Sequence, residues 1–198
     1  HGFLREPNDI QSYSALACIA IQSNQNDQHG GQSVPNFDYA MAKGVAKTYI
    51  KLYRQNLLKA FELLVEGRSV EAEVNEAFEK LKREEGAVPT MNLHVGYTKL
   101  EAALLNDVIA DEAVMARAQE FAREKAEAET DRSTYQAMEA FVHNLNTMHS
   151  RAGAQIPFSS INYGMDTTPE GRMVIKNILL ATEAGLGNGE TPIFPIHI

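Results

Sequence analysis

Residues 156–198 read IPFSSINYGMDTTPEGRMVIKNILLATEAGLGNGETPIFPIHI. The first part, residues 156–164, is short, aromatic and closed by a glycine, which is typical of a β-strand. Thr168 and Pro169 then begin a helix, with proline at the first helical position. The apolar run from Thr191 to Ile198 predicts a second strand. A strand, a helix of roughly eighteen residues and another strand together predict a right-handed parallel βαβ crossover, with both strands buried on two faces.

Upstream of this unit, the apolar spacing is that of long helices. Asn8 or Asp9 can cap a first helix that ends at Gly30-Gly31, and Pro35-Asn36 restarts a second helix that runs for about thirty residues to Gly67. Ser69 caps a third helix closed by Gly86, Thr98 begins a fourth, and a fifth runs from Asp111 to about Ser150. Residues 87–97 are loop-like with a short extended piece at Met91–Val95, and the charge run 123–132 indicates a solvated helix face.

These patterns predict an α/β fold that is predominantly helical. We expect one domain with three parts: two helices in residues 1–67, a helical region in 68–150 and strand–helix–strand in 151–198. The stripe on the second helix predicts a helix–helix interface, and a helix of that length favours dimerisation. Because the chain opens without Met and stops on an apolar strand, we expect it to be a piece of a longer protein.

Composition excludes several classes of protein. The 198 residues carry a net charge of −8, which argues against a broad nucleic-acid-binding face but leaves small anionic ligands open. Cys18 is the only cysteine, so neither an internal disulfide framework nor a four-cysteine zinc site can form within the chain. No apolar run is long enough for a membrane span and no signal peptide is visible, so a reducing cytoplasm is the expected location.

Ligands of parallel α/β folds bind at the carboxyl ends of strands, where loops meet helix N-termini. At the end of the first predicted strand stand Ser159, Ser160 and Asn162, whose hydroxyl and amide groups could bind a sugar or phosphate. The alternative is that the serine and threonine side chains here only finish the strand and cap the next helix. The polar junction 26–39, NDQHGGQSVPNFDY, has the same two interpretations: a helix stop and restart, or a surface that meets a ligand or partner.

The remaining candidates favour structural roles. The loop 185–190 follows a helix and precedes a strand, the reverse of a phosphate-binding loop, and is explained by a helix end and a tight turn. His29 is expected to cap a helix C-terminus, and Cys18 is expected to be inert packing. The other histidines lack metal-ligand spacing, so we expect no metal site: His94, His143, His149 and His197. No arrangement for nucleophilic catalysis can be argued from spacing.

Three stretches resemble one family, the class III anaerobic, glycyl-radical ribonucleoside-triphosphate reductases. They are SNQNDQHGGQSVPNFDYAMAKGV (residues 23–45), SRAGAQIPFSSINYG (150–164) and PEGRMVIKNILLATEAGLGNGETPIFP (169–195). The resemblance implies a ten-stranded α/β barrel of which this chain is an internal part of the catalytic domain. It also implies conversion of ribonucleoside triphosphates to deoxyribonucleotides by glycyl and thiyl radicals, with structural zinc, formate or a thiol reductant, and a radical-SAM activase.

The resemblance places the thiyl cysteine, the radical glycine and the zinc site outside these residues, so the chain is expected to contain no catalytic residue and to be inactive alone. It implies a homodimer formed by the first two helices, which also bind a dNTP or ATP effector. The matching effector positions are Glu6, Asn8, Asp9 and Lys51, although Asn8 stands where the family often has a basic residue. Ser159, Ser160 and Asn162 would face substrate inside the barrel. The alternatives are a non-catalytic helical interaction module and a lyase-type glycyl-radical enzyme.

Overall fold

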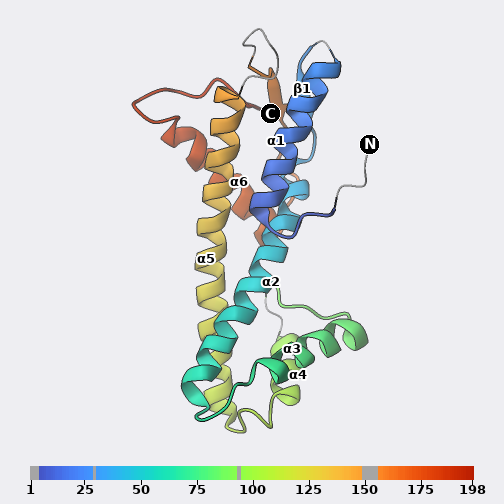
Figure 1. The fold of residues 1–198 in the computed structure, drawn as a ribbon, viewed down its shortest axis with the longest axis vertical. Helices are drawn as coiled ribbons and strands as arrows, with labels where there is room; N and C mark the ends of the chain where they lie inside the picture. The colour runs from blue at the N-terminus through green and yellow to red at the C-terminus, as the bar shows by residue number, and fades with distance from the viewer. Residues whose placement is uncertain (1–4, 29, 93–94, 149–155) are drawn as a thin grey trace. The chain divides into compact units, whose positions relative to one another are not determined.

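The computed structural model describes residues 5–28, 30–92, 95–148 and 156–198. The chain is mostly helical with a small parallel sheet, which confirms the α/β class (Figure 1). In chain order the elements are α1 (Ile10–Asp27), β1 (Gln32–Val34), α2 (Phe37–Leu64), α3 (Glu71–Lys80), the π-helical turn η1 (Leu81–Glu85), α4 (Val95–Leu104), α5 (Glu112–Thr147), β2 (Ser159–Ile161), α6 (Pro169–Ala184) and β3 (Ile196–His197). Within the described ranges, no helix is both long and apolar enough to cross a bilayer.

Several helix ends lie where capping chemistry predicted them. Asp9 caps α1, since its Oδ1 accepts a hydrogen bond of 2.7 Å from the backbone N–H of Ser12. Asp111 accepts from Ala113 N at 2.9 Å and so starts α5. Thr168 caps α6, with Pro169 as the first helical residue.

Other boundaries were predicted wrongly. The residue that caps α3 is Val70, and Ser69 Oγ only accepts a long 3.4 Å bond from Glu71 N. The fourth helix begins at Val95 rather than Thr98, so Val95 does not belong to an extended piece. Ser150 lies outside the described residues.

The contacts divide the chain into two compact units. Unit 1 contains the chain up to Lys47 and from Asp131 onward, whereas unit 2 is Thr48–Thr130. The boundaries fall inside α2 and α5. The predicted functional division at residues 67 and 150 stays a prediction.

Unit 1 holds the sheet, whose strand order is β1-β2-β3 with both pairs parallel. The pairing of β2 with β3 confirms the predicted parallel strand–helix–strand unit, with Ile161 opposite His197. Strand β1 was not predicted. It pairs with β2 across more than a hundred residues of chain, with Val34 opposite Ile161. Its sequence Gln-Ser-Val is short and polar, so only this long-range pairing makes it a strand.

The predicted burial of both strands on two faces is wrong for β3. Ile161 of β2 is fully buried, but Ile196 of β3 is 41% exposed. A side chain of α5 instead holds the segment that leads into β3. Asn146 of α5 accepts from Ile193 N and Phe194 N through Oδ1 and donates to Phe194 O through Nδ2, so it fixes the segment that enters β3.

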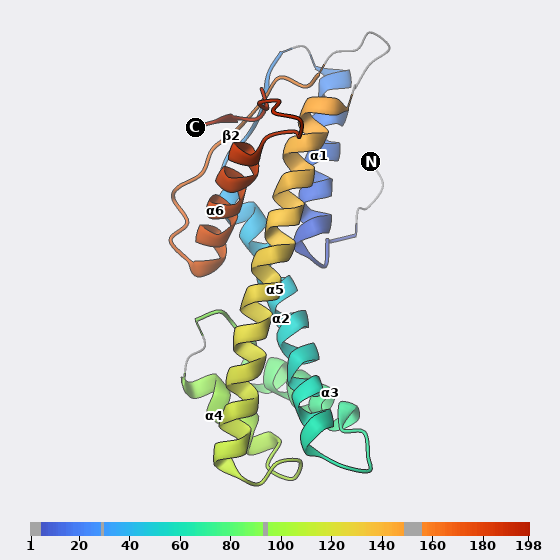
Figure 2. The same ribbon diagram turned by 90° about the vertical axis from the view of Figure 1, so that its left-hand side faces the viewer.

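Helix α6 runs beside the part of α5 that belongs to unit 1 (Figures 1 and 2). Lys176 Nζ lies 2.6 Å from Asp131 Oδ1, and Asn177 Nδ2 donates to the same oxygen at 2.9 Å. Phe37 at the start of α2 contacts Phe141 of α5 with ring centroids 5.1 Å apart. These contacts join the helices around one apolar core.

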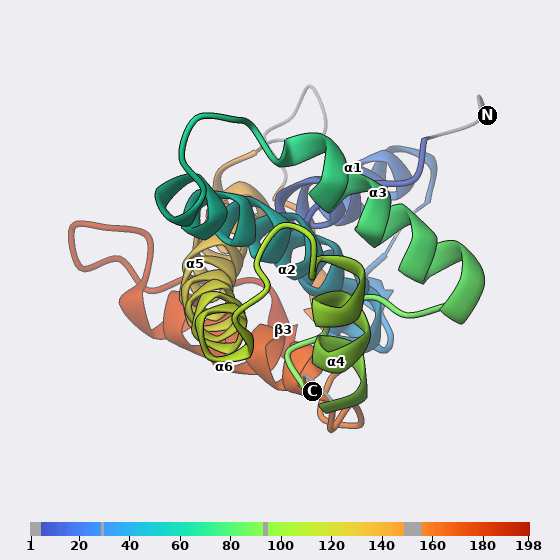
Figure 3. The same ribbon diagram turned by 90° about the horizontal axis from the view of Figure 1, so that it is seen from below.

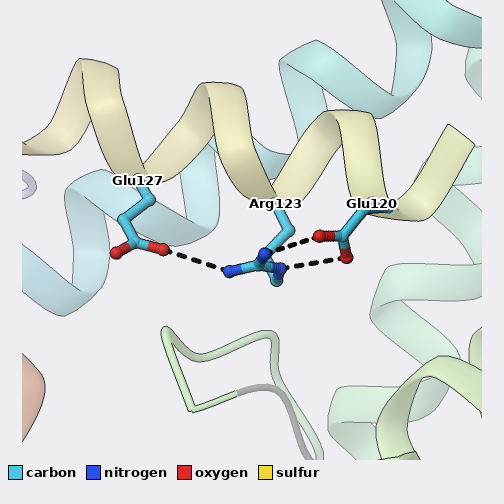
Figure 4. A network of polar contacts seen from close by, with 3 residues as sticks. All are labelled: Glu120, Arg123 and Glu127. Carbon is cyan, nitrogen blue, oxygen red and sulfur yellow. Dashed lines mark hydrogen bonds and ion pairs between the residues drawn. The ribbon is translucent and has the colours of Figure 1, made fainter. Parts of the chain in front are cut away.

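The described residues of unit 2 form helices joined by loops, without a strand, and α3 lies next to α4 within it (Figure 3). Its core centres on Tyr53 of α2, whose ring lies 6.1–6.4 Å from the rings of Tyr49, Phe78 and Tyr97. On the surface, Arg123 is bound by Glu120 and Glu127 one turn to either side (Figure 4). This trio confirms that the charge run begins as a solvated face with intrahelical pairs.

Candidate functional site

The carboxyl ends of the three parallel strands meet at one edge of the sheet, which we call the carboxyl edge. Two of these strands lead into helices: β1 is followed by α2 from Phe37, and β2 is followed by α6 from Pro169. Helix N-termini present unpaired N–H groups and a positive dipole end. The carboxyl edge therefore has the architecture of a ligand site in a parallel α/β protein.

Asp38 holds this edge together. Its carboxylate is fully buried, and Oδ2 accepts backbone hydrogen bonds from Gly164 and Asp166, each 2.9 Å long. Oδ1 accepts from Tyr39 N at 2.9 Å. Burial alone would raise the pKa of Asp38, but these backbone donors outweigh it and hold the pKa below its usual value. Asp38 thus ties the first turn of α2 to the loop after β2, a role that sequence reasoning missed.

A second buried carboxylate shapes the same loop. Asp166 Oδ1 accepts from Thr168 N at 2.9 Å and from Thr168 Oγ1 at 2.6 Å. Thr168 Oγ1 in turn accepts from Gly171 N, which caps α6. A Cβ on Gly171 would lie 2.3 Å from Asp166 Cγ, so only glycine fits there. The loop is consequently fixed by its own hydrogen bonds.

The three predicted substrate residues do not all face the same way. Side chains alternate along a strand, so Ser160 and Asn162 share one face with Ser33 of β1, while Ser159 points to the other. Ser33 Oγ donates to Asn162 Oδ1 at 3.2 Å. Ser159 is fully buried, and its hydroxyl has no hydrogen-bond partner among the described residues. The accessible polar group at this edge is therefore Ser33, Ser160 and Asn162.

His197 links the end of β3 to its neighbours. Its Nδ1 lies 2.9 Å from the Tyr163 hydroxyl, and its Nε2 lies 3.2 Å from Thr182 Oγ1. Thr182 uses its own proton on Ile178 O at 2.7 Å, so its oxygen must accept from Nε2–H. Tyr163 then donates to Nδ1, and the imidazole is neutral. Burial lowers the pKa of His197 and raises that of Tyr163, in agreement with this assignment.

The predicted effector residues at the start of α1 are partly engaged within the chain. Glu6 Oε1 lies 2.9 Å from Lys47 Nζ and accepts from the Tyr13 hydroxyl at 3.1 Å. Lys47 Nζ also donates to Pro7 O at 2.9 Å. The hydrogen bond from Lys47 lowers the pKa of Glu6 and raises that of Lys47. Sequence reasoning missed Lys47, whose position one turn before Lys51 was the available signal.

The other effector candidates lie as follows. Asp9 is half-buried and caps α1, and Asn8 is exposed beside it. Lys51 is exposed on the part of α2 that belongs to unit 2. These positions do not test whether the four residues contact an effector, so all four assignments remain predictions.

The residues expected to be structural have such positions where they are described. Gly185 ends α6. The backbone N–H of Leu186 donates to Glu190 O, and the N–H of Glu190 donates to Gly187 O, which together form the predicted tight turn. Cys18 is buried, and burial raises the pKa of its thiol to about 12, so it is protonated packing rather than a nucleophile. His29 lies outside the described residues, as do His94 and His149. Over the described ranges, no group of three metal-ligating side chains is brought together.

Comparison with known proteins gives one consistent result. The family model for anaerobic ribonucleoside-triphosphate reductase matches residues 1–198. A protein of that name from Enterobacteria phage T4 is 41% identical over 71 residues, covering 35% of this chain and 12% of that protein. The protein of that name from Salmonella typhimurium is 36% identical over 87 residues (43% and 12%), and that from Escherichia coli K12 is 35% identical over 71 residues (35% and 10%). The matched stretches thus span about a tenth of each relative's length.

Proposed function

Because this chain belongs to the anaerobic ribonucleoside-triphosphate reductase family over residues 1–198, we propose that it is part of a cytoplasmic enzyme that converts ribonucleoside triphosphates to deoxyribonucleotides. The reaction replaces the ribose 2′-hydroxyl by hydrogen through glycyl and thiyl radicals. Cys18 is buried with a protonated thiol, so it is unsuited to carry the thiyl radical. The role of this chain in the reaction is to bind and orient nucleotides.

The carboxyl edge is the proposed substrate wall. Ser33, Ser160 and Asn162 lie on one face of the sheet, where hydroxyl and amide groups can bind ribose hydroxyls or phosphate oxygens. The observation that carries this proposal is the parallel alignment of β1, β2 and β3, which brings these groups to one edge. In the whole enzyme, this sheet would form part of the ten-stranded barrel. Ser159 would support the wall from behind.

The proposed effector and dimer surface lies on α1 and the start of α2. A groove of about 420 Å³ runs there between α1, β1 and α2, with Leu16, Ala20 and Met41 in its lining. A second copy of the chain would cover it, and Glu6, Asn8 and Asp9 would meet the effector nucleotide. The assignment of Lys51 to this site rests on the family resemblance.

The substrate proposal is tested in the full-length protein that contains this chain, under strict anoxia with its radical-SAM activase, ribonucleoside triphosphate and formate or dithiol. We expect deoxyribonucleotide formation. Ser160→Ala and Asn162→Ala should each raise KM about tenfold, the effect of a lost hydrogen bond of about 1–1.5 kcal/mol. Asn106→Ala, at an exposed position of unit 2, serves as the control. Absence of product from the wild type, with a formed glycyl radical, would contradict the reductase assignment.

The effector proposal has a separate measurement. A dNTP that binds the folded state raises Tm by mass action, with about 2.7 kcal/mol of added stability at a hundred times Kd. Removal of the carboxylate just before α1, by Glu6→Ala, should weaken that shift, and Glu62→Ala on the exposed face of α2 should not. If no dNTP changes the Tm, the result would instead favour the alternative, a non-catalytic helical interaction module.

A further inference from the structure

Glu101 of α4 is a carboxylic acid in the middle of the core of unit 2. It is 0% exposed, as only apolar residues usually are. Side chains from two other helices bind it. Tyr53 of α2 donates its hydroxyl to Glu101 Oε1 at 2.8 Å, and Gln119 of α5 donates Nε2–H to the same oxygen at 3.0 Å.

The other carboxyl oxygen is unpaired. Glu101 Oε2 is buried and has no hydrogen-bond partner in the described part of the chain. The hydroxyl of Tyr49 is also buried without a hydrogen-bond partner among the described residues. Tyr97, one turn earlier on α4, has its hydroxyl beside the carboxyl group and interacts with it. Burying a carboxylate away from water without an opposite charge is costly, whereas the neutral acid can donate a proton from Oε2 to a neighbouring hydroxyl oxygen.

Among the described residues, no cation lies against Glu101 to compensate the charge that its ionised form would carry. The groups that face it are Tyr49 and Tyr53 from α2, Tyr97 from α4 and the neutral amide of Gln119 from α5. From α3, Phe78 packs against Tyr53. Arg123 of α5 is held on the surface by Glu120 and Glu127 (Figure 4), and Glu101 makes no ion pair with any described residue.

Gln119 is itself fixed in a way that fits a neutral acid. Its Nε2 donates to Thr98 O at 2.9 Å as well as to Glu101 Oε1, so the amide cannot turn to offer another proton. Both donors to Glu101 therefore end on Oε1. A protonated Oε2 would complete the set by donating to a hydroxyl oxygen, and the Tyr97 hydroxyl lies beside this carboxyl group.

We propose that Glu101 is a neutral carboxylic acid in the folded protein, with its proton on Oε2, and that unit 2 is consequently a pH-sensitive element. Burial raises the pKa of Glu101, which agrees with this state. The unfolded chain has an ordinary glutamate with a pKa near 4.3. Above that value the unfolded state has lost its proton while the folded state keeps it, so folding takes up one proton.

The direction of the pH effect follows. The contribution of Glu101 to stability is fully present below about pH 4.3 and is lost as pH rises toward its folded pKa. Over that range, uptake of one proton makes the folding constant of unit 2 fall about tenfold per pH unit. Above the folded pKa, Glu101 is ionised in both states and the stability of unit 2 stops falling with pH.

The test uses the 198-residue chain and the variant Glu101→Gln, a neutral group of the same shape that can donate from its amide. Infrared spectra at about pH 7 should show a protonated carboxylic acid band in the wild type that is missing from Glu101→Gln. Urea unfolding of unit 2, measured from pH 5 to 9, should depend on pH in the wild type and lose this tenfold slope in Glu101→Gln. Glu62→Gln, on the exposed face of α2, is the control and should keep both signals.

A second variant keeps the proposal testable if Glu101→Gln does not fold. Tyr53→Phe removes a donor that favours the ionised form, so the carboxyl should hold its proton to higher pH and the loss of stability should move upward. A Glu101 carbon resonance that titrates near the ordinary glutamate value in the folded wild type would overturn the proposal. So would a Glu101→Gln variant with an unchanged pH slope.

Discussion

Asp38 binds more of the surrounding backbone than its place in the sequence suggests. In the sequence it is one acidic residue in the first turn of a helix, where a favourable dipole is the ordinary explanation. In the fold its two oxygens accept three backbone N–H groups, two of which belong to a loop more than 120 residues later. Helix α2 and the carboxyl edge are joined through this one side chain.

Asp38→Asn should therefore be costly although it conserves shape. An amide cannot accept at both ends, so at least one backbone donor loses a charge-assisted bond, and we expect a loss of about 2–3 kcal/mol in the free energy of unfolding. Urea denaturation at pH 7 measures it, and Asp27→Asn, at an exposed position, should change stability by less than about 0.5 kcal/mol. A loss in Asp38→Asn no larger than in the control would contradict this role.

His197 gives a residue-scale prediction about protonation. Burial lowers its pKa, and Tyr163 donates to Nδ1, which also favours the neutral ring. In proton-detected NMR, His197 should titrate below the ordinary value of about 6.5. Tyr163→Phe should raise its titration midpoint, because the donor to the neutral form is lost. Titration of His197 above the ordinary histidine value would refute the assigned tautomer.

At the scale of elements, helices were predictable because their signals are local. Asp9, Asp111 and Thr168 each cap the helix that follows them, and the apolar spacing between them needs no knowledge of the partner. The strands were less predictable. Strands β2 and β3 are only three and two residues long, shorter than their apolar sequence runs. β1 is polar and exists through its pairing with β2, which is a non-local event.

The same limit applies to the candidate site. Ser160 and Asn162 could be predicted from their place after a strand, but Ser33 joined them only once β1 was paired. Asp38 and His197 were missed because each acts on groups distant in sequence. Asp166 was missed although the side chain it binds, Thr168, is only two residues away. Lys51 was predicted from the family resemblance, whereas the ion pair between Lys47 and Glu6 could be found only from the fold.

Substitutions at two helix glycines test how closely their helices pack against neighbouring parts of the chain. A Cβ on Gly44 of α2 would lie 2.9 Å from Ile10 Cα of α1, so the two backbones approach closely there. Gly44→Ala should destabilise unit 1 by about 1–3 kcal/mol through overpacking. Gly96 of α4 has nothing within 4 Å of the same position, so Gly96→Ala should stabilise the chain by about 0.5–1 kcal/mol. Thermal unfolding of the two variants should show shifts of opposite sign.

At the scale of the whole molecule, the two units differ in how they hold ionisable groups. Unit 1 buries Asp38 and His197, whose pKa values are both lowered, so its stability from these groups is present at high pH and is lost as pH falls. Unit 2 buries Glu101, whose pKa is raised, so its contribution is lost as pH rises. The net charge of −8 adds a repulsion that belongs to the whole chain and does not distinguish the units.

Because the pKa shifts in the two units have opposite signs, acid should destabilise unit 1 and base should destabilise unit 2. Urea unfolding followed by two-dimensional NMR at about pH 5, 7 and 9 reports the units separately, because each residue's signal disappears with its own unit. The midpoint for residues 131–198 should rise from pH 5 to 7 as His197 becomes neutral. The midpoint for residues 48–130 should fall from pH 5 to 9, and Glu101→Gln should flatten only this second dependence. A single midpoint that moves in one direction for both units would show that neither set of buried groups governs its own unit.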